Sequence, residues 1–303
     1  MEKTDSLKVV QKLQIYIEQQ LQSPITLLDL AREAGYSPWH IGRMFREVTG
    51  KSPFEYIRRR RLTQAALFMR DNKRKVLDVA LDFEFDSQEG FTRAFSREFG
   101  ISPYQYYKKS PPIRLFLPEK AYDTYRSLYY VRNRKEKTVN KMKTIFVQVI
   151  ERPERKALVK RGKEASEYFK YCEEAGCDVW DILSSVKEAL YEPIGMWMPK
   201  AMRAGGSEYI QGVEVPLNYS NSVPEGFELI DLPACQMMVF QGEPYEDERF
   251  ADAIDEVWQH IEQFQPETYG YQWAVEDAPR FQLAPMGYRG YIEARPVRKI
   301  IDN

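Results

Sequence analysis

Hydrophobic positions in the first hundred residues recur at intervals of three and four. Ile41, Met44, Phe45 and Val48 follow this spacing, which predicts a helix with one apolar face. Ser37 is a suitable N-cap for this helix, and Pro38 is a suitable first helical residue. A glycine and a Ser-Pro pair follow it, which are typical of a helix end.

The same pattern occurs a second time. Residues 27–57 match residues 76–107, with an offset of 49 before the turn and 50 after it. Each copy is typical of a helix, a tight turn and a second helix, which is the helix-turn-helix pattern. In the second copy the predicted core residues are Phe91, Ala94, Phe95 and Phe99.

Residues 53–70 lie between the copies and favour one helix about 27 Å long. Held by such a strut, two second helices can enter successive major grooves about 34 Å apart, so one chain reads both as a monomer. Four consecutive arginines, Arg58 to Arg61, cannot all point the same way. We expect one or two of them to contact phosphate and the others to form internal salt bridges.

The outward faces of the second helices carry side chains suited to base edges. Trp39, Arg43 and Arg46 oppose the apolar stripe of the first, and Arg93 and Arg97 that of the second. Arginine suits guanine and glutamine suits adenine. Glu89 and Ser96 are also expected to face outward, with Gln88 in the first turn. The alternative is that these are solvated charges on ordinary helical hairpins, with Trp39 packed against a neighbour.

The second half of the chain alternates as strands do and is also built twice. Residues 146–162, around Pro153, resemble residues 227–242, around Pro233, at an offset of 80. Helical segments with a tryptophan follow, at 179–190 and 250–264, and each half ends in a strand that contains proline. This order predicts an α+β domain with pseudo-twofold symmetry and an antiparallel sheet.

Charge separates the two halves. Residues 1–110 carry 19 basic and 14 acidic side chains, residues 111–143 carry 9 and 3, and residues 144–303 carry 16 and 28. The excess of +5 and +6 before an excess of −12 favours an N-terminal domain that meets a polyanion, although a chance distribution of solvated charge remains an alternative. We assign 1–110 to a DNA-binding domain, 111–143 to a basic linker and 144–303 to the α+β domain.

Composition argues against several other classes. No apolar run approaches the roughly 20 residues of a membrane span, and the first residues lack the order of a signal peptide, so we expect a cytoplasmic protein. Three cysteines, Cys172, Cys177 and Cys235, are interpreted as reduced thiols. His40 and His260 have no evident nucleophile beside them, and no phosphate loop or metal cluster is present in the sequence. We therefore expect no cofactor, no metal and no enzyme.

Residues 25–107 resemble the DNA-binding domain of the AraC/XylS family. "YSPWHIGRMF" and "FDSQEGFTRAF" are especially similar to its branch that includes MarA, SoxS and Rob. The resemblance implies seven helices, monomeric binding to a double-stranded promoter element, and activation through contact with RNA polymerase. The predicted DNA-binding residues are Trp39, Arg43, Arg46, Gln88, Glu89, Thr92, Arg93 and Arg97.

Two residues depart from that branch. Glu89 stands where glutamine is usual, which puts the preference of the second half-site in doubt. Glu84 stands where many members have glycine, so the second turn is mildly strained if it requires a positive φ.

Residues 144–300 resemble the GyrI-like effector-binding fold, in which a cleft between two halves binds small molecules. The resemblance implies aromatic walls and a glutamate on the last strand, where "YIEARPV" places Glu293. A carboxylate among aromatic rings favours a cation, so we expect an aromatic or cationic effector. The predicted ligand-binding residues are Glu293, Tyr291, Trp180, Trp197, Tyr209, Trp273 and Tyr288. The alternatives are core packing for each aromatic residue and an exposed strand carboxylate for Glu293.

These observations predict a transcriptional regulator, with activation as the expected mode, that responds to a small molecule in its C-terminal domain. Two alternatives stay open. Some proteins of the GyrI-like class are hydrolases, which would make Glu293 an acid or base assisted by Tyr291. The third possibility is a drug-sequestering protein.

Overall fold

The computed structural model describes residues 3–72, 74–118, 144–176, 178–246 and 249–300. The chain divides into two compact parts, Met1–Asn133 and Arg134–Asn303, which are called the helical domain and the sheet domain below. Most of the predicted linker, residues 119–143, lies outside the described residues, and so does Cys177. Cys235 is a free thiol, as expected.

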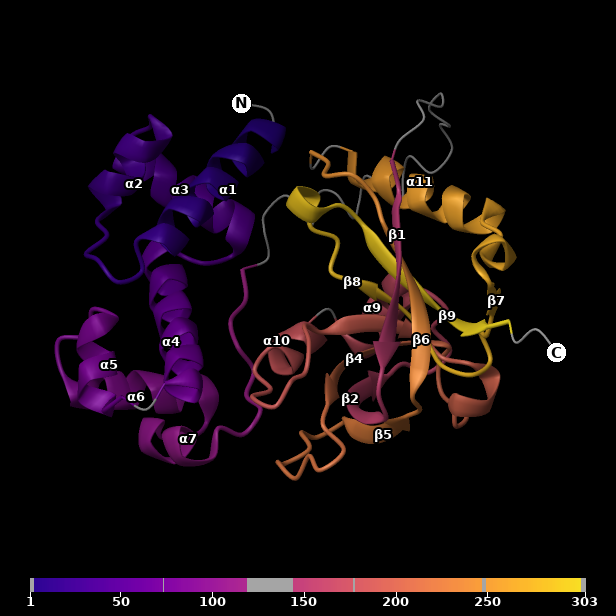
Figure 1. Cartoon of the computed structure of the whole chain (residues 1–303). Coiled ribbons are helices and arrows are strands. Elements are labelled where there is room, and N and C mark those ends of the chain that lie inside the picture. Colours follow the sequence, from indigo (N-terminus) through magenta and orange to yellow (C-terminus); the bar gives the residue numbers. More distant parts are fainter. Residues whose placement is uncertain (1–2, 73, 119–143, 177, 247–248, 301–303) are drawn as a thin grey trace. The chain divides into compact units, whose positions relative to one another are not determined.

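Among the described residues of the helical domain, seven helices lie between Lys3 and Lys109, which agrees with the number that the family resemblance implies (Figure 1). Each of α3, α4, α6 and α7 follows a serine whose Oγ accepts a hydrogen bond from the first turn. Ser37 and Pro38 therefore begin α3 as predicted, and the Ser-Pro pair that follows α3 begins α4. The helices are α1 Lys3–Gln19, α2 Leu27–Ala34, α3 Pro38–Thr49, α4 Pro53–Asp71, α5 Val76–Asp82, α6 Gln88–Phe99 and α7 Pro103–Lys109.

Each helix-turn-helix copy has its own core, and α4 contributes to both. Tyr56 and Ile57, near the start of α4, pack with α1, α2 and α3. Leu62 and Met69, further along the same helix, pack with α5, α6 and α7. The predicted strut is therefore a shared wall between two cores, and it runs one residue beyond the predicted end, to Asp71.

The predicted linker begins too early. Ile113 and Leu115 are buried in the second core, with exposures of 7% and 1%. The Phe116 amide donates to Thr63 Oγ1 at 2.9 Å, and the Arg60 guanidinium donates to the Phe116 carbonyl. Residues 111–118 thus belong to the helical domain, because their alternating apolar side chains cover α4.

The sheet domain is built on one antiparallel sheet, with α9, α10 and α11 as its α-helices among the described residues (Figure 1). The strand order is β1-β6-β9-β8-β3-β4-β2-β5, and β7 pairs with β9. The elements are β1 Phe146–Arg152, β2 Arg155–Arg161, α9 Tyr168–Ala175, α10 Val179–Leu183, β3 Ile194–Trp197, β4 Tyr209–Val215, β5 Glu228–Leu232, β6 Cys235–Gln241, α11 Phe250–Gln263, β7 Tyr271–Trp273, β8 Arg280–Leu283 and β9 Ile292–Lys299.

The strand order has the twofold symmetry that the sequence repeat predicts. Exchanging β1 with β5, β2 with β6, β3 with β8 and β4 with β9 reverses the order onto itself. Pro153 and Pro233 occupy equivalent turns, between β1 and β2 and between β5 and β6. Gly195 of β3 and Gln282 of β8 pair directly at the centre, so the pseudo-axis passes beside them.

The helices of the two halves are less alike than predicted. The helix predicted over 179–190 is only Val179–Leu183, because the chain turns at Ser184 and Ser185, where the Ser185 hydroxyl donates to the Ile182 carbonyl. A helix that was not predicted, α9, precedes it. The second predicted helix is present as α11.

Candidate nucleic-acid interface

Helix α3 presents a broad polar face. Trp39 is 71% exposed, which excludes the alternative that it packs against a neighbour. Arg43 Nε donates to Glu47 Oε1 at 2.7 Å, and the Arg43 guanidinium lies 5.7 Å from the centre of the Trp39 ring. Arg46 is exposed beside them. Trp39, Arg43 and Arg46 therefore share one accessible helix face.

Helix α6 presents a similar face with fewer internal contacts. Gln88, Glu89, Arg93 and Arg97 are exposed, and Thr92 is half-buried. Within the described residues no ion pair holds Arg93 or Arg97. Ser96, which is predicted to face outward, is half-buried.

The core faces of both helices mostly follow the prediction. The rings of Phe91 and Phe95 are fully buried, whereas Ala94 and Phe99 are half-buried because they lie at the margin of the second core.

The two turns share one backbone geometry. Gly35 and Glu84, which are equivalent in the repeat, have φ of 73° and 61°. The amide of Tyr36 donates to the Ala31 carbonyl, and that of Phe85 donates to the Ala80 carbonyl. Glu84 thus adopts the left-handed conformation for which glycine is favoured, which confirms the expected strain at the second turn.

The four arginines of α4 separate by position. Arg59 bonds Glu98 at 2.7 Å and lies over the Phe116 ring. Arg60 is 3% exposed and forms a two-point contact with Glu18 at 2.6 and 2.7 Å. Arg61 donates to two backbone carbonyls after α1, at 2.9 and 2.7 Å.

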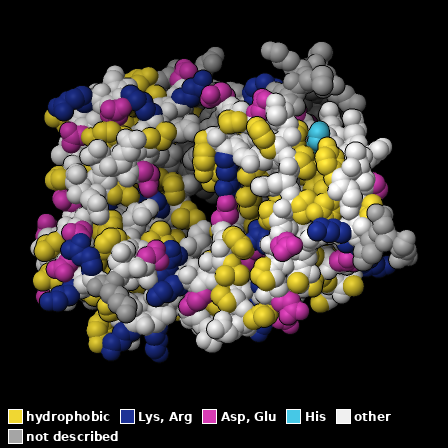
Figure 2. Space-filling view, viewed as in Figure 1, with side chains coloured by type: hydrophobic (Ala, Val, Ile, Leu, Met, Phe, Trp, Pro, Cys, Tyr) yellow, Lys and Arg dark blue, Asp and Glu magenta, His cyan; other side chains and the backbone are white. Residues whose placement is uncertain are grey.

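The prediction of internal salt bridges in this run is confirmed for Arg59 and Arg60. Arg58 is exposed, and the expected contact of this run with phosphate stays a prediction. Figure 2 shows basic side chains spread among acidic ones over the visible face of the helical domain, not gathered in one patch.

Comparisons with known proteins cover this part of the chain. The helix-turn-helix domain family matches residues 30–109. Regulatory protein SoxS of Escherichia coli (strain K12) is 38% identical over 99 residues, which are 33% of this chain and 92% of SoxS. The chain belongs to the AraC-type helix-turn-helix family.

The match to longer relatives is confined to the same region of this AraC-type chain. Transcriptional regulator Rob of Salmonella typhimurium is 42% identical over 119 residues, which are 37% of this chain and 41% of Rob. The chain thus spans less than half the length of this relative. The solved DNA-binding domain of AdpA in complex with a target DNA aligns at 22% identity, over 42% of this chain and 97% of that one, with a TM-score of 0.31.

In the sheet domain, Glu293 is fully buried, not an exposed strand carboxylate. Its Oε2 accepts from Trp258 Nε1 at 2.8 Å and contacts the Tyr291 hydroxyl at 3.1 Å. Its Oε1 accepts from Arg295 Nε at 3.1 Å and from Arg280 at 3.5 Å. Two guanidinium groups therefore neutralise this carboxylate from within the protein.

Two of the predicted tyrosines meet at the pseudo-axis. Tyr209 and Tyr291 are buried, and the Gln282 side chain contacts the hydroxyl of each, at 3.3 and 2.9 Å. Gly195 leaves room for this contact, since a Cβ there would overlap the Tyr209 hydroxyl. Burial raises the pKa of both tyrosines, so both hydroxyls stay protonated at neutral pH.

The other predicted ligand residues are dispersed. Trp197 is buried under Arg280, whose guanidinium lies 4.2 Å from the ring centre. Trp180 and Trp273 are half-buried, and Tyr288 is 77% exposed. The structure thus joins Glu293, Tyr291 and Tyr209 through Gln282, with Trp197 reaching Glu293 only through Arg280.

Sequence reasoning missed the polar row across the sheet centre. Strand pairing places Gln211, Gly195, Gln282 and Glu293 side by side on β4, β3, β8 and β9. Gln211 is 1% exposed, and its Oε1 has no hydrogen-bond partner among the described residues. The row was missed because its members are far apart in the chain, and only the strand register brings them together.

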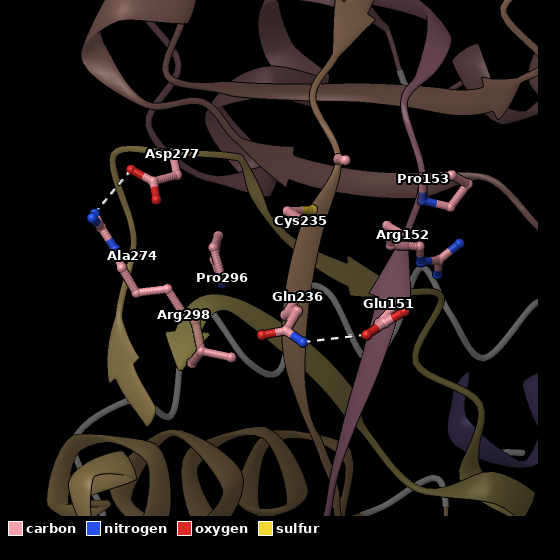
Figure 3. Close-up of a pocket in the computed structure, with 11 residues that line it drawn as sticks. Glu151, Arg152, Pro153, Cys235, Gln236, Ala274, Asp277, Pro296 and Arg298 are labelled. Atoms are coloured by element: carbon pink, nitrogen blue, oxygen red, sulfur yellow. Dashed lines mark hydrogen bonds and ion pairs between the residues drawn. The ribbon is translucent and has the colours of Figure 1, made fainter. Parts of the chain in front are cut away.

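A cavity of about 480 Å³ lies elsewhere in the domain, where β1, β6 and β9 border the turn after β7 (Figure 3). Asp277 bonds Arg298 at 3.1 Å and Gln236 bonds Glu151 at 3.3 Å among its lining residues. None of the seven predicted ligand residues lines it.

No helix in the described part of the chain is long and apolar enough to cross a membrane. The described residues also contain no cluster of His, Cys, Asp or Glu suited to a metal ion.

Proposed function

We propose that the protein is a transcriptional regulator that binds promoter DNA as a monomer and reads two successive major grooves. The observation that carries this is the pairing of α3 and α6 with α4, whose two ends pack in the two cores. At 19 residues, α4 is about 28 Å long, close to the groove spacing of about 34 Å. The family resemblance extends the proposal to activation through RNA polymerase.

Exposed arginines on equivalent helix positions support base reading in both grooves. Arg43 and Arg93 each lie in the middle of a reading face and are exposed. A guanidinium that contacts guanine O6 and N7 together contributes about 1–3 kcal/mol of discrimination. The test is therefore to remove each one separately.

The experiment selects a preferred duplex for the full chain and then titrates it with Arg43→Ala and Arg93→Ala. Each variant should lose about 1–3 kcal/mol of specific binding, and affinity of the parent should fall steeply with salt. Arg32→Ala is the matched control, because Arg32 is 75% exposed on α2 and outside both reading faces. If both variants bound specific and random DNA as the parent does, the groove assignment would be wrong.

The second part of the proposal is that the sheet domain is GyrI-like and binds a small effector that alters DNA binding. Its symmetric strand order and the polar row at the pseudo-axis support this. Buried polar groups in the middle of a sheet are unusual where packing is the only requirement, and Gln211 Oε1 has no hydrogen-bond partner in the described part of the chain. Because Arg280 and Arg295 already neutralise Glu293, the geometry favours an aromatic effector over one selected by its positive charge.

This part is tested by a thermal-shift screen of aromatic compounds in matched cationic and neutral forms, followed by DNA titrations with each hit. An effector should raise the melting temperature and change the affinity for the selected duplex. Compounds that stabilise the protein and leave DNA binding unchanged would rule out the regulatory role of the sheet domain. The proposal that the helical domain binds DNA would still stand.

One observation favours a second candidate, a small-molecule hydrolase. Glu293 and the Tyr291 hydroxyl lie 3.1 Å apart, which is the reach needed for proton transfer between them. In that case a hit from the screen would be consumed over hours by the parent and preserved by Glu293→Gln. An intact hit after incubation with the parent would remove this candidate.

A further inference from the structure

The Arg43 side chain is held at both sides along α3. Trp39, one turn before it, offers its ring face, and Glu47, one turn after it, accepts from Nε at 2.7 Å. The bond uses Nε, so the two terminal Nη atoms have no hydrogen bond within the described residues. Those two atoms are the pair that an arginine presents end-on to guanine O6 and N7.

Such an ion pair has little effect on the stability of the fold. The side chains of Arg43 and Glu47 are 62% and 61% exposed, and exposed pairs one turn apart stabilise a helix only weakly. The pair can nevertheless affect DNA recognition, because it orders the Arg43 side chain. A long side chain that is already ordered loses less conformational freedom when it meets a base.

The second copy has the same arginine without the same support. In the repeat Arg93 is equivalent to Arg43, whereas Arg97 stands in place of Glu47 and Glu89 in place of Trp39. No acceptor therefore follows Arg93 one turn later. Both helices otherwise begin after a capping serine, end at a left-handed glycine and bury one apolar face.

We propose that Glu47 is a positioning residue for DNA recognition, which holds Arg43 so that its Nη atoms select guanine in the first groove. The proposal rests on the proposed function, since it assigns a role within the same reading face. Glu47 does not itself contact the base. In a complex with DNA, the Glu47 carboxylate would lie near the phosphate groups. Its charge therefore lowers the affinity for DNA of any sequence, while its bond to Arg43 raises the discrimination between guanine and other bases.

These two effects have opposite signs, which separates positioning from simple charge. Removing Glu47 should strengthen binding to random DNA, because one repulsive charge is lost. It should weaken discrimination at one base pair only, because Arg43 becomes free to sample other orientations. A residue needed only for folding would weaken binding to every duplex.

The experiment uses the full chain and three duplexes: the selected site, the same site with the guanine pair that Arg43→Ala identifies replaced by an adenine pair, and a random sequence. For Glu47→Ala we expect about a 2–5-fold gain on random DNA and about a 3–10-fold loss of discrimination between the first two duplexes. Glu47→Gln retains an acceptor for Arg43 Nε–H, so it should show the gain and keep most of the discrimination.

Glu89→Ala is the matched variant, since it removes a carboxylate from the other reading face. It should strengthen binding to random DNA and leave discrimination at the first-groove guanine intact. Equal shifts on all three duplexes for Glu47→Ala would overturn the proposal and show that the carboxylate acts only by its charge. A parent chain that does not prefer the selected site would instead overturn the proposed function.

Discussion

The two helix-turn-helix copies share a plan but differ in how each is held. In the first copy, Thr26 and Asp29 form a reciprocal cap at the start of α2, and Gly35 makes the turn after it. In the second, Lys75 has no side-chain cap on α5, and Glu84 makes the equivalent turn at a φ of 61°. The difference teaches that the repeat specifies topology more closely than it specifies local stability.

Tertiary packing replaces the missing local signals in the second copy. Phe85, Phe91, Phe95 and Phe99 pack ring against ring, with centres 4.7–5.5 Å apart. The segment 111–118 adds further apolar side chains to the same core. A short helix without a side-chain cap at its start is retained because its apolar face packs in a large core.

The largest effect is expected from removing one core ring in each copy. Phe45→Ala and Phe95→Ala each leave a cavity at a fully buried site and should cost about 3–5 kcal/mol. Because the copies have separate cores, amide hydrogen exchange should accelerate first in the copy that carries the change. Equal acceleration in both copies would show that the helical domain unfolds as one unit, so that the two copies do not differ in local stability.

A smaller effect is expected from giving α5 the cap that α2 has. Lys75→Thr places a hydroxyl at the N-cap with Asp78 three residues later, and should stabilise by about 1 kcal/mol. Thr26→Ala is the reciprocal change and should destabilise by a similar amount. Denaturant titration measures both, and a Lys75→Thr protein no more stable than the parent would show that packing already fixes the start of α5.

The turn at Glu84 should respond more weakly still. Glu84→Gly relieves the left-handed strain but adds freedom to the unfolded chain, so we expect a net gain of about 0.5 kcal/mol. Glu84→Ala keeps a Cβ and should give no gain. A comparable gain from both variants would assign the effect to the lost charge and not to backbone strain.

The smallest effect is a dependence on acid. Hydrogen bonds from Thr26 hold the pKa of Asp29 below its ordinary value of 3.8. The stabilising contribution of the cap is therefore present above that value and is lost as the pH falls through the lower, folded value. Exchange of the α2 amides should accelerate over that range in the parent and show no added acceleration in Asp29→Asn.

Some features of the helical domain could be predicted from the sequence and others could not. Helix ends in the helical domain were predictable because capping serines, prolines and glycines act on adjacent residues. The predicted start of the linker was wrong because the burial of Ile113 and Leu115 depends on α4, more than forty residues earlier. In the candidate interface, the exposure of Trp39 agrees with its place opposite the apolar stripe, whereas the bond from Arg43 to Glu47 was not anticipated.

The sequence alone determined the double helix-turn-helix plan, the faces of α3 and α6, and the twofold repeat of the sheet domain, because periodicity and turn residues act locally. The tertiary structure alone decided which side chains meet. Strand register joined Gln211, Gln282 and Glu293 in one row, and the fold buried Glu293 in ion pairs with Arg280 and Arg295. Charge pairing and burial depend on distances between remote residues, which no local pattern records.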